Sequence, residues 1–324
     1  MLSRINVDNK TIKYLSNLNE GYQEIFWKIE TTVYTIKEDV KDFALDNYMK
    51  YKNVSALLEL ASQYNYSTDK LINVLEVVKE SNIIHNQMTS YHIDRILRKI
   101  YEDDFPREEI SQQVMNLEIF FLPIINEKNG LRYLRFSLSK YPRLAADLIK
   151  FSYKTEKMNE QLELTEEEKR LAEISHSILF TVKFSPTNDG VGLIDYNTLK
   201  EWCNQYISAV TDNNQITIGL QYLGRFLANT NMMKEGEYPQ EPVKQVIEDI
   251  FNEELLRGFV IEVSNKLGVR TISDGSDLLN LAKKYDNYAQ NSKMYPKTYK
   301  MLRNISDDFY RDYESEKTSA KYDD

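Results

Sequence analysis

The spacing of apolar residues along this chain predicts amphipathic α-helices almost from end to end. Within each predicted helix, apolar side chains recur every three or four residues, as at Leu71, Leu75 and Val78. The helices begin at residues that cap helices well, for example Asn53 and Ser67. Of 324 residues only 10 are Gly and 7 are Pro, too few for the many turns of an all-β protein. We therefore expect an all-α fold.

Start signals and the same periodicity predict further helices. Thr165 and Glu168 form a capping box ahead of one helix, and Thr89 or Ser90 begins another. Other helices are predicted over residues 196–211, 214–229, 242–256, 276–291 and 297–316. Because consecutive helices joined by short loops bury each other's apolar faces, we expect an α-solenoid-like or layered helical arrangement.

One segment, Gly258 to Val269, fits a β-strand. Its Phe259, Ile261 and Val263 alternate with polar neighbours, which is typical of a strand with one buried face. The same residues equally fit an extension of the preceding helix. At most one minor hairpin is therefore expected.

The chain divides best at the polar segment Lys154–Glu163. This predicts an N-terminal helical half (1–154), a linker (155–163) and an acidic C-terminal helical half (164–324). The net charge of −9 is uneven: residues 1–160 hold 22 Lys and Arg against 23 Asp and Glu, and residues 161–324 hold 19 against 27. An acidic chain is not expected to coat nucleic acid or an anionic membrane with its whole surface. A nucleic-acid contact would have to come from the first half.

Targeting and redox features are sparse. The start of the chain, MLSRIN, lacks the apolar core of a signal peptide, and the longest apolar stretch, Ile119–Ile125, is far shorter than the roughly 20 residues of a membrane span. We expect a cytoplasmic protein with no membrane contact. The single cysteine, Cys203, excludes an intramolecular disulfide. It adjoins Trp202 in a helical pattern and is predicted to be a packed core residue.

No complete catalytic or nucleotide-binding motif is present. Gly219 and Gly224 have the spacing of a phosphate-binding loop, but Arg225 and Phe226 follow where the loop needs Lys and Ser or Thr. Both glycines also lie inside a helical pattern. We interpret them as sites where two helices approach closely.

A metal site is not predicted either. Residues 187–198 resemble a calcium loop around Gly192, but Val191 stands at one ligand position and Thr198 replaces the bidentate carboxylate. We interpret the segment as a glycine-rich turn, with Asp195 capping the next helix. The three histidines, His85, His92 and His176, have no zinc-site spacing. We expect no cofactor, and the balance of features is against an enzyme.

One charge cluster stands out in the sequence. Between residues 128 and 157, eight cations face only Asp147 and Glu156, and aromatic residues are interleaved with them. The cations are Lys128, Arg132, Arg135, Lys140, Arg143, Lys150, Lys154 and Lys157.

Three interpretations of this basic segment remain open. Arg143 and Lys150 can pair with Asp147 within one helix. Alternatively, the segment binds an acidic protein surface, or it contacts phosphates and stacks on bases. The candidate partner-binding residues are Arg132, Arg135, Lys140, Tyr141 and Arg143.

A series of short motifs from about Phe105 onward follows a recognisable order. They are Leu117-Glu118 with Phe121-Leu122-Pro123, Ser139-Lys140-Tyr141-Pro142-Arg143, Gly192-Leu193-Ile194-Asp195 ahead of Leu199-Lys200-Glu201-Trp202, Ile218-Gly219, Tyr238-Pro239-Gln240-Glu241-Pro242-Val243, Arg257-Gly258-Phe259, and Tyr295-Pro296-Lys297-Thr298. In this order the chain resembles the C-terminal region of large, uncharacterised bacterial multidomain proteins. The resemblance implies no activity, and those proteins usually carry further domains in front. Ser273-Asp274-Gly275 stands where the resemblance places a Gly-Gly turn.

Together these features predict a non-enzymatic helical scaffold or adaptor that binds other macromolecules. The expected partner is another protein of the same system. The resemblance alone suggests a bacterial defence or stress-response system. The alternative is a nucleic-acid-binding module that uses the basic segment at 128–157, and a third possibility is an enzyme whose site follows no readable motif.

Overall fold

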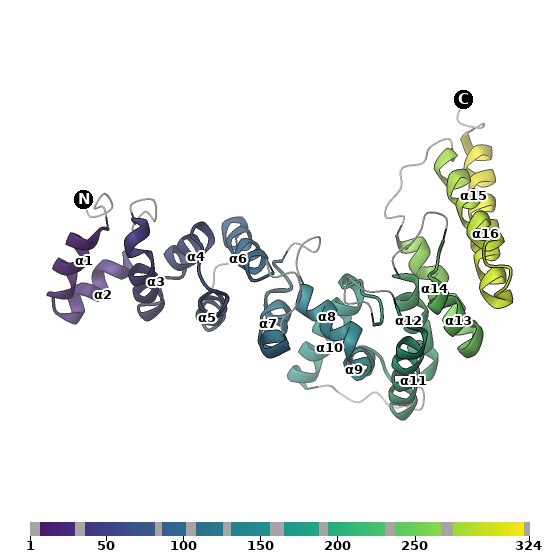
Figure 1. Ribbon diagram of the computed structural model, residues 1–324, viewed down its shortest axis with the longest axis horizontal. Helices are drawn as coiled ribbons and strands as arrows, with labels where there is room; N and C mark the ends of the chain where they lie inside the picture. Colours follow the sequence, from purple (N-terminus) through teal and green to yellow (C-terminus); the bar gives the residue numbers. More distant parts are fainter. Residues whose placement is uncertain are drawn as a thin grey trace. The chain divides into compact units, whose positions relative to one another are not determined.

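The protein is built from α-helices that pack in sequential pairs, as the computed structural model shows (Figure 1). The structure describes residues 7–29, 36–81, 86–101, 108–125, 131–155, 165–187, 194–230, 237–266 and 275–320. Within these ranges 79% of residues are helical and there is no strand, only an isolated bridge between Val7 and Ile36. The predicted all-α fold is confirmed.

The helices follow one another along the chain with short connections. They are α1 (Asn9–Ser16), α2 (Glu20–Lys28), the short 3-10 helix η3 (Glu38–Val40), α3 (Lys41–Lys50), α4 (Val54–Gln63), α5 (Thr68–Lys79), α6 (Gln87–Ile100), α7 (Glu108–Phe121), α8 (Arg132–Lys140), α9 (Pro142–Ser152), α10 (Glu166–Thr181), α11 (Tyr196–Asp212), α12 (Ile216–Ala228), α13 (Glu241–Ile250), α14 (Glu253–Asn265), α15 (Ser276–Gln290) and α16 (Pro296–Ala320).

The chain forms two compact units, Met1–Leu134 and Arg135–Asp324, and the division falls inside α8. The sequence places a linker at 155–163 instead. Most of that linker lies outside the described residues, so the predicted halves stay a prediction. In the second unit α9 and α10, the helices before and after the predicted linker, pack against each other.

In the first unit, α4 packs against α3, α5 and α6. The cap of α4 ties it to α2, because the Asn53 side chain accepts from the Ala56 N–H and donates to the Trp27 carbonyl oxygen at 2.9 Å. Trp27 is fully buried and meets Tyr48 edge to face, with ring centroids 5.1 Å apart. The caps predicted from sequence therefore also fix how neighbouring helices meet.

A buried carboxylate, that of Glu118, binds the last residues of the first unit. Glu118 of α7 accepts hydrogen bonds from the backbone N–H groups of Tyr133 (3.0 Å) and Leu134 (2.6 Å) in the first turn of α8. It also accepts from the Tyr101 hydroxyl at 2.5 Å. A negative charge at a helix N-terminus is favoured by the helix dipole and by the free N–H groups there. Glu118 therefore holds the start of α8.

In the second unit, α12 and α14 touch backbone to backbone. A Cβ atom on Gly224 would lie 2.0 Å from the Leu255 carbonyl oxygen, and one on Gly258 would lie 1.7 Å from the Gln221 carbonyl oxygen. Gly219 is also crowded, by the side chain of Val210. The interpretation of Gly219 and Gly224 as helix-packing residues is confirmed.

The structure decides one open interpretation and corrects two element bounds. Of the two interpretations of residues 258–269, the helical one is confirmed for the described part, because residues 258–266 belong to α14 and its C-terminal end, while residues 267–269 lie outside the described part. The helix predicted over 242–256 is two helices, α13 and α14, separated at residues 251–252. The helix predicted to begin at Thr89 or Ser90 begins at Gln87, because the Asn86 side chain accepts from the Thr89 N–H and is the true cap.

None of the helices in the described ranges is both long and apolar enough to cross a membrane.

Candidate functional site

The basic segment is divided between different structural roles. Arg132 is half-buried at the start of α8, and its guanidinium donates to the Tyr101 carbonyl oxygen within the first unit. This hydrogen bond joins the end of α6 to α8. Arg135 is also half-buried. Two of the five candidate residues therefore lie partly within the protein.

The other three candidates surround the corner where α8 ends and α9 begins. Lys140 is exposed, with its Nζ atom 5.6 Å from the ring centroids of both Phe136 and Tyr141. Tyr141 is the N-cap residue of α9 and is 43% exposed. Arg143 is exposed in the first turn of α9. The corner thus presents two cations and an aromatic ring within four consecutive residues.

Pairing with Asp147 does not account for the two cations of α9, Arg143 and Lys150. Among the described residues, neither Arg143 nor Lys150 forms an ion pair with Asp147, although all three belong to α9. The Nζ atom of Lys150 lies 5.9 Å from the ring centroid of Phe151. Neither cation of α9 is therefore held in an ion pair by Asp147.

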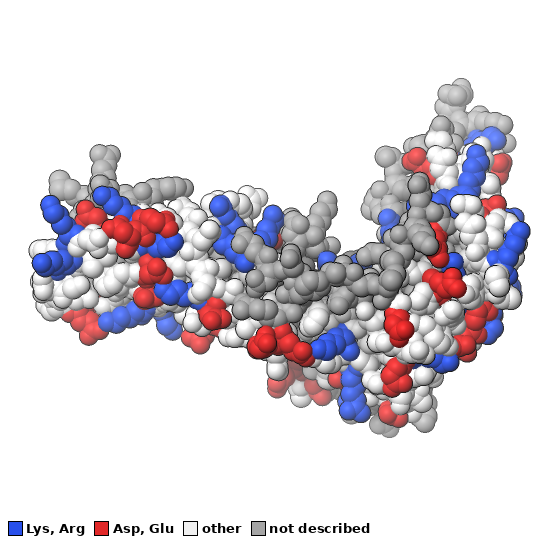
Figure 2. All heavy atoms as spheres, in the orientation of Figure 1, with Lys and Arg blue, Asp and Glu red and all other residues white. Residues whose placement is uncertain are grey.

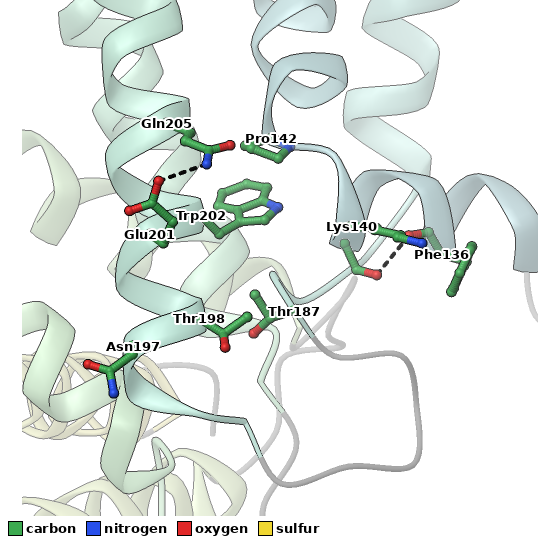
Figure 3. A pocket seen from close by; sticks show the side chains of 10 residues that line it. Phe136, Lys140, Pro142, Thr187, Asn197, Thr198, Glu201, Trp202 and Gln205 are labelled. Carbon is green, nitrogen blue, oxygen red and sulfur yellow. Dashed lines mark hydrogen bonds between the residues drawn. The ribbon is translucent and has the colours of Figure 1, made fainter. Parts of the chain in front are cut away.

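A cavity of about 670 Å³ opens beside this corner (Figure 3). Its walls come from the end of α8, the start of α9, the segment after α10 and the first half of α11. The lining residues are Phe136, Ser139, Lys140, Pro142, Thr187, Asn197, Thr198, Glu201, Trp202 and Gln205. The segment after α10 is held to α8 because the Thr187 N–H donates to the Ser139 carbonyl oxygen at 2.9 Å.

A second cavity, of about 430 Å³, continues along the same helix. It is lined by Tyr141, Pro142, Arg143, Gln205, Ser208, Ala209 and Asp212. Pro142 and Gln205 line both cavities, so the two lie next to each other, and we call them together the α11 groove. Its α11 side runs from Asn197 to Asp212, about 22 Å at 1.5 Å per residue.

Two buried polar atoms at the groove lack hydrogen-bond partners. The indole N–H of Trp202 and the hydroxyl of Thr187 are both buried, and no group in the described part of the chain pairs with either. Trp202 is only 4% exposed, and in Figure 3 its indole nitrogen is on the side of the ring that faces Lys140. A buried donor left unpaired costs about 1 to 3 kcal/mol. A hydrogen-bond acceptor on a bound molecule would relieve that cost.

The two walls of the groove carry opposite charges. Lys140 and Arg143 lie on the α8–α9 wall, where the N-terminus of α9 adds the positive end of its dipole. Glu201 and Asp212 lie on the α11 wall, and Glu201 accepts from the Gln205 amide at 2.8 Å (Figure 3). On the face shown in Figure 2, basic and acidic side chains are interspersed over the described residues. On this face (Figure 2) the described residues therefore form no large patch of a single charge sign.

Other reactive groups in the described residues have structural roles. Burial raises the pKa of the Cys203 thiol to about 12, so it stays protonated and packed at neutral pH, as predicted. Glu262 is 1% exposed and pairs with Arg225 (3.2 Å) and Lys183 (3.1 Å), which fixes α14 against α12. No group of three metal-ligating side chains is found in the described ranges. Most of the calcium-like loop, residues 188–193, lies outside them, but Asp195 does cap α11 by accepting from the Thr198 N–H at 2.8 Å.

Comparison of the chain with protein-family models, with curated proteins and with solved structures gives no match. The groove is therefore the basis for a functional proposal. The sequence pattern identified Lys140, Tyr141 and Arg143 but not the α11 wall. Glu201, Trp202 and Gln205 do recur at helical spacing, although nothing in the sequence indicates that this stripe faces the α8–α9 corner.

Proposed function

We propose that this protein is a helical scaffold or adaptor that binds another protein through the α11 groove. The observation that carries the proposal is the juxtaposition, in one open groove, of Lys140, Arg143 and the unpaired indole N–H of Trp202. Interfaces are enriched in arginine and in aromatic residues, and their energy is concentrated in a few such side chains. The groove offers these groups on rigid helices.

The alternative of nucleic-acid binding has less support. A nucleic-acid backbone places a negative charge at every nucleotide, and binding is dominated by contacts between cations and phosphates. The groove sets Glu201 and Asp212 opposite its two cations, and these carboxylates would repel a run of phosphates. A protein segment, whose charges need not repeat, suits this arrangement better. The proposed setting, a bacterial multi-protein system, rests on the sequence resemblance alone.

A photo-cross-linking experiment tests the proposal. Tyr141, at the junction of the groove, is replaced by p-benzoylphenylalanine, and the full chain is irradiated in cells of its own host. The matched control carries the same replacement at Phe180 of α10, which is 71% exposed and lines neither cavity of the groove. We expect a discrete protein adduct from position 141 that is absent from position 180 and insensitive to nuclease.

Two results would contradict the proposal. Equal adducts from both positions would mean that the groove has no special role in binding. Adducts from position 141 that disappear after nuclease treatment would replace the protein partner by a nucleic acid.

A further inference from the structure

We infer that the α11 groove accepts an extended peptide segment whose single acidic side chain lies between Lys140 and Arg143, with a backbone carbonyl oxygen directed at the indole N–H of Trp202. This inference rests on the proposed function and specifies the chemistry of the partner. Four features carry it: the length of the groove, the charges at its junction, its unpaired donor and the carboxylates on its far wall.

The dimensions of the groove suit a peptide better than a small metabolite. The stripe of α11 that lines it is about 22 Å long. An extended chain advances about 3.3 Å per residue, so six or seven residues would fill the groove. The two cavities, of about 670 and 430 Å³, are adjacent and share Pro142 and Gln205. We infer that one continuous strand of peptide lies along both cavities.

The junction is the most favourable place for one negative charge. Lys140 lines the first cavity and Arg143 lines the second, so the two cations flank the junction. Pro142 is the first residue of α9, which begins there without a side-chain cap. A carboxylate at a helix N-terminus interacts with the positive end of the dipole, and an arginine can bind it through two parallel hydrogen bonds.

The first cavity supplies a donor and an apolar wall. The Trp202 N–H has no partner in the described part of the chain, so a carbonyl oxygen that reached it would satisfy a buried donor that is otherwise unpaired. Phe136 and the ring of Trp202 line the same cavity. An apolar side chain of the peptide, near the acidic residue in sequence, would pack on these rings.

The carboxylates on the α11 wall of the groove limit the peptide to one acidic side chain. Glu201 stands opposite Lys140 in the first cavity, and Asp212 lines the second with Arg143. A second acidic residue a few places along the peptide would approach one of these carboxylates. The groove therefore selects an isolated Asp or Glu among apolar or basic residues and discriminates against polyanions.

The test begins with a random heptapeptide library displayed on phage and selected on the full-length protein. We expect enrichment of peptides with one Asp or Glu and an apolar residue within three positions of it. The selected peptide is then synthesised and its affinity measured against four proteins. These are the wild type, the Lys140→Gln/Arg143→Gln variant, the Trp202→Phe variant, and a control, Lys150→Gln/Lys154→Gln, which removes the same charge from exposed positions that do not line the groove.

The groove variant should bind at least tenfold more weakly than the wild type, and the control within twofold of it. The chain has two tryptophans, so its indole N–H spectrum contains one signal from Trp202 and one from Trp27 of the first unit. The peptide should shift the Trp202 signal, which Trp202→Phe identifies by its loss, and leave the Trp27 signal in place. This readout holds even if Trp202→Phe folds less well. Single-stranded dT12 should not compete with the peptide.

Several outcomes would overturn the inference: no enriched peptide, enriched peptides without an acidic residue, equal affinity of the groove and control variants, an unmoved Trp202 signal, or displacement of the peptide by dT12. These outcomes are separable from failure of the proposed function. If cross-linking at position 141 captures a protein while no heptapeptide binds, the adaptor function stands and the extended-segment inference is wrong.

Discussion

Replacing Gly224 by alanine should destabilise the second unit strongly, although alanine is the better helix former. In α12 the change gains about 1 kcal/mol of helix propensity. The new Cβ atom, however, would lie 2.0 Å from the Leu255 carbonyl oxygen and 2.7 Å from the Phe259 backbone nitrogen, both in α14. Neither atom belongs to a flexible side chain. The helices must therefore separate by more than about 1 Å to restore an ordinary contact.

Helices α12 and α14 pack against each other (Figure 1), and that separation would loosen the side chains between them. A gap of about 0.5 to 1 Å forfeits a quarter to a half of the dispersion energy of each contact. Leu223 and Phe259, which are fully buried, would lose contacts of this kind, and the pairing of Arg225 with Glu262 would lengthen. Overpacking usually costs about 1 to 3 kcal/mol and occasionally more; a clash with backbone should reach about 4 kcal/mol, so the net loss is about 3 kcal/mol. This corresponds to a fall in melting temperature of roughly 6 to 12 °C for a unit of this size.

Urea unfolding followed by circular dichroism measures the loss, and two other glycines calibrate it. Gly21 of α2 is exposed and a Cβ atom there meets only the Asn19 side chain at 3.6 Å, so Gly21→Ala should be neutral or slightly stabilising. At Gly219 the obstacle is the Val210 side chain, so Gly219→Ala should be intermediate, and Val210→Ala should relieve it only in part because the Val210 Cβ atom, 2.8 Å away, remains. If Gly224→Ala lowered the free energy of unfolding by less than about 1 kcal/mol, the argument from backbone contact would be refuted.

Three further changes test other contacts. Glu118→Gln should cost about 2 to 3 kcal/mol in urea unfolding, because it removes the charge that holds the buried first turn of α8; an unchanged midpoint would contradict this. Arg132→Gln should cost about 1 to 2 kcal/mol by losing its bond to a backbone carbonyl, and Arg143→Gln less than about 0.5 kcal/mol; equal effects would be inconsistent with these roles. Burial, with a smaller effect of Arg95, lowers the pKa of His92 below 6.5 in the folded state. The unfolded chain therefore binds the proton more tightly, and the free energy of unfolding should fall as the pH drops below about 6.5. The difference between the urea unfolding midpoints at pH 7.5 and at pH 5.5 should be smaller in His92→Gln than in the wild type.

The sequence was informative wherever a feature depends on neighbours along the chain. Helix caps are of this kind: Asn53, Ser67, Thr165 and Asp195 all accept from the backbone three residues ahead, as expected. The interpretation of Gly219 and Gly224 also succeeded, because glycine weakens a helix and is best tolerated there where a side chain would not fit. The partner of Gly224, which is Gly258 on α14, could not be identified, because no local pattern records which helices meet.

Of the two interpretations of residues 258–269, the strand was wrong and the helix right, for a physical reason that is visible in α14. Phe259 and Val263 are four residues apart and both buried, which is helical spacing, whereas Ile261 is 39% exposed on another face. The apparent alternation of apolar and polar residues arose because one exposed isoleucine fell between two core positions. A scattered apolar residue on the surface is common in folded proteins, and it can imitate the two-residue period of a strand.

In the basic segment, the number of cations does not by itself show which of them lie at the candidate site. Arg132 is drawn inward because the end of α6 leaves carbonyl groups that need partners, and its guanidinium meets the carbonyl oxygen of Tyr101. Lys140 and Arg143 remain outside because they precede and follow the turn at Pro142, which faces the groove. The proposed binding function rests on this corner: a turn between two helices sets two cations around the positive end of a helix dipole, with the acidic wall of α11 opposite. Under that proposal, cations at a helix junction contribute more to recognition than cations along a helix face.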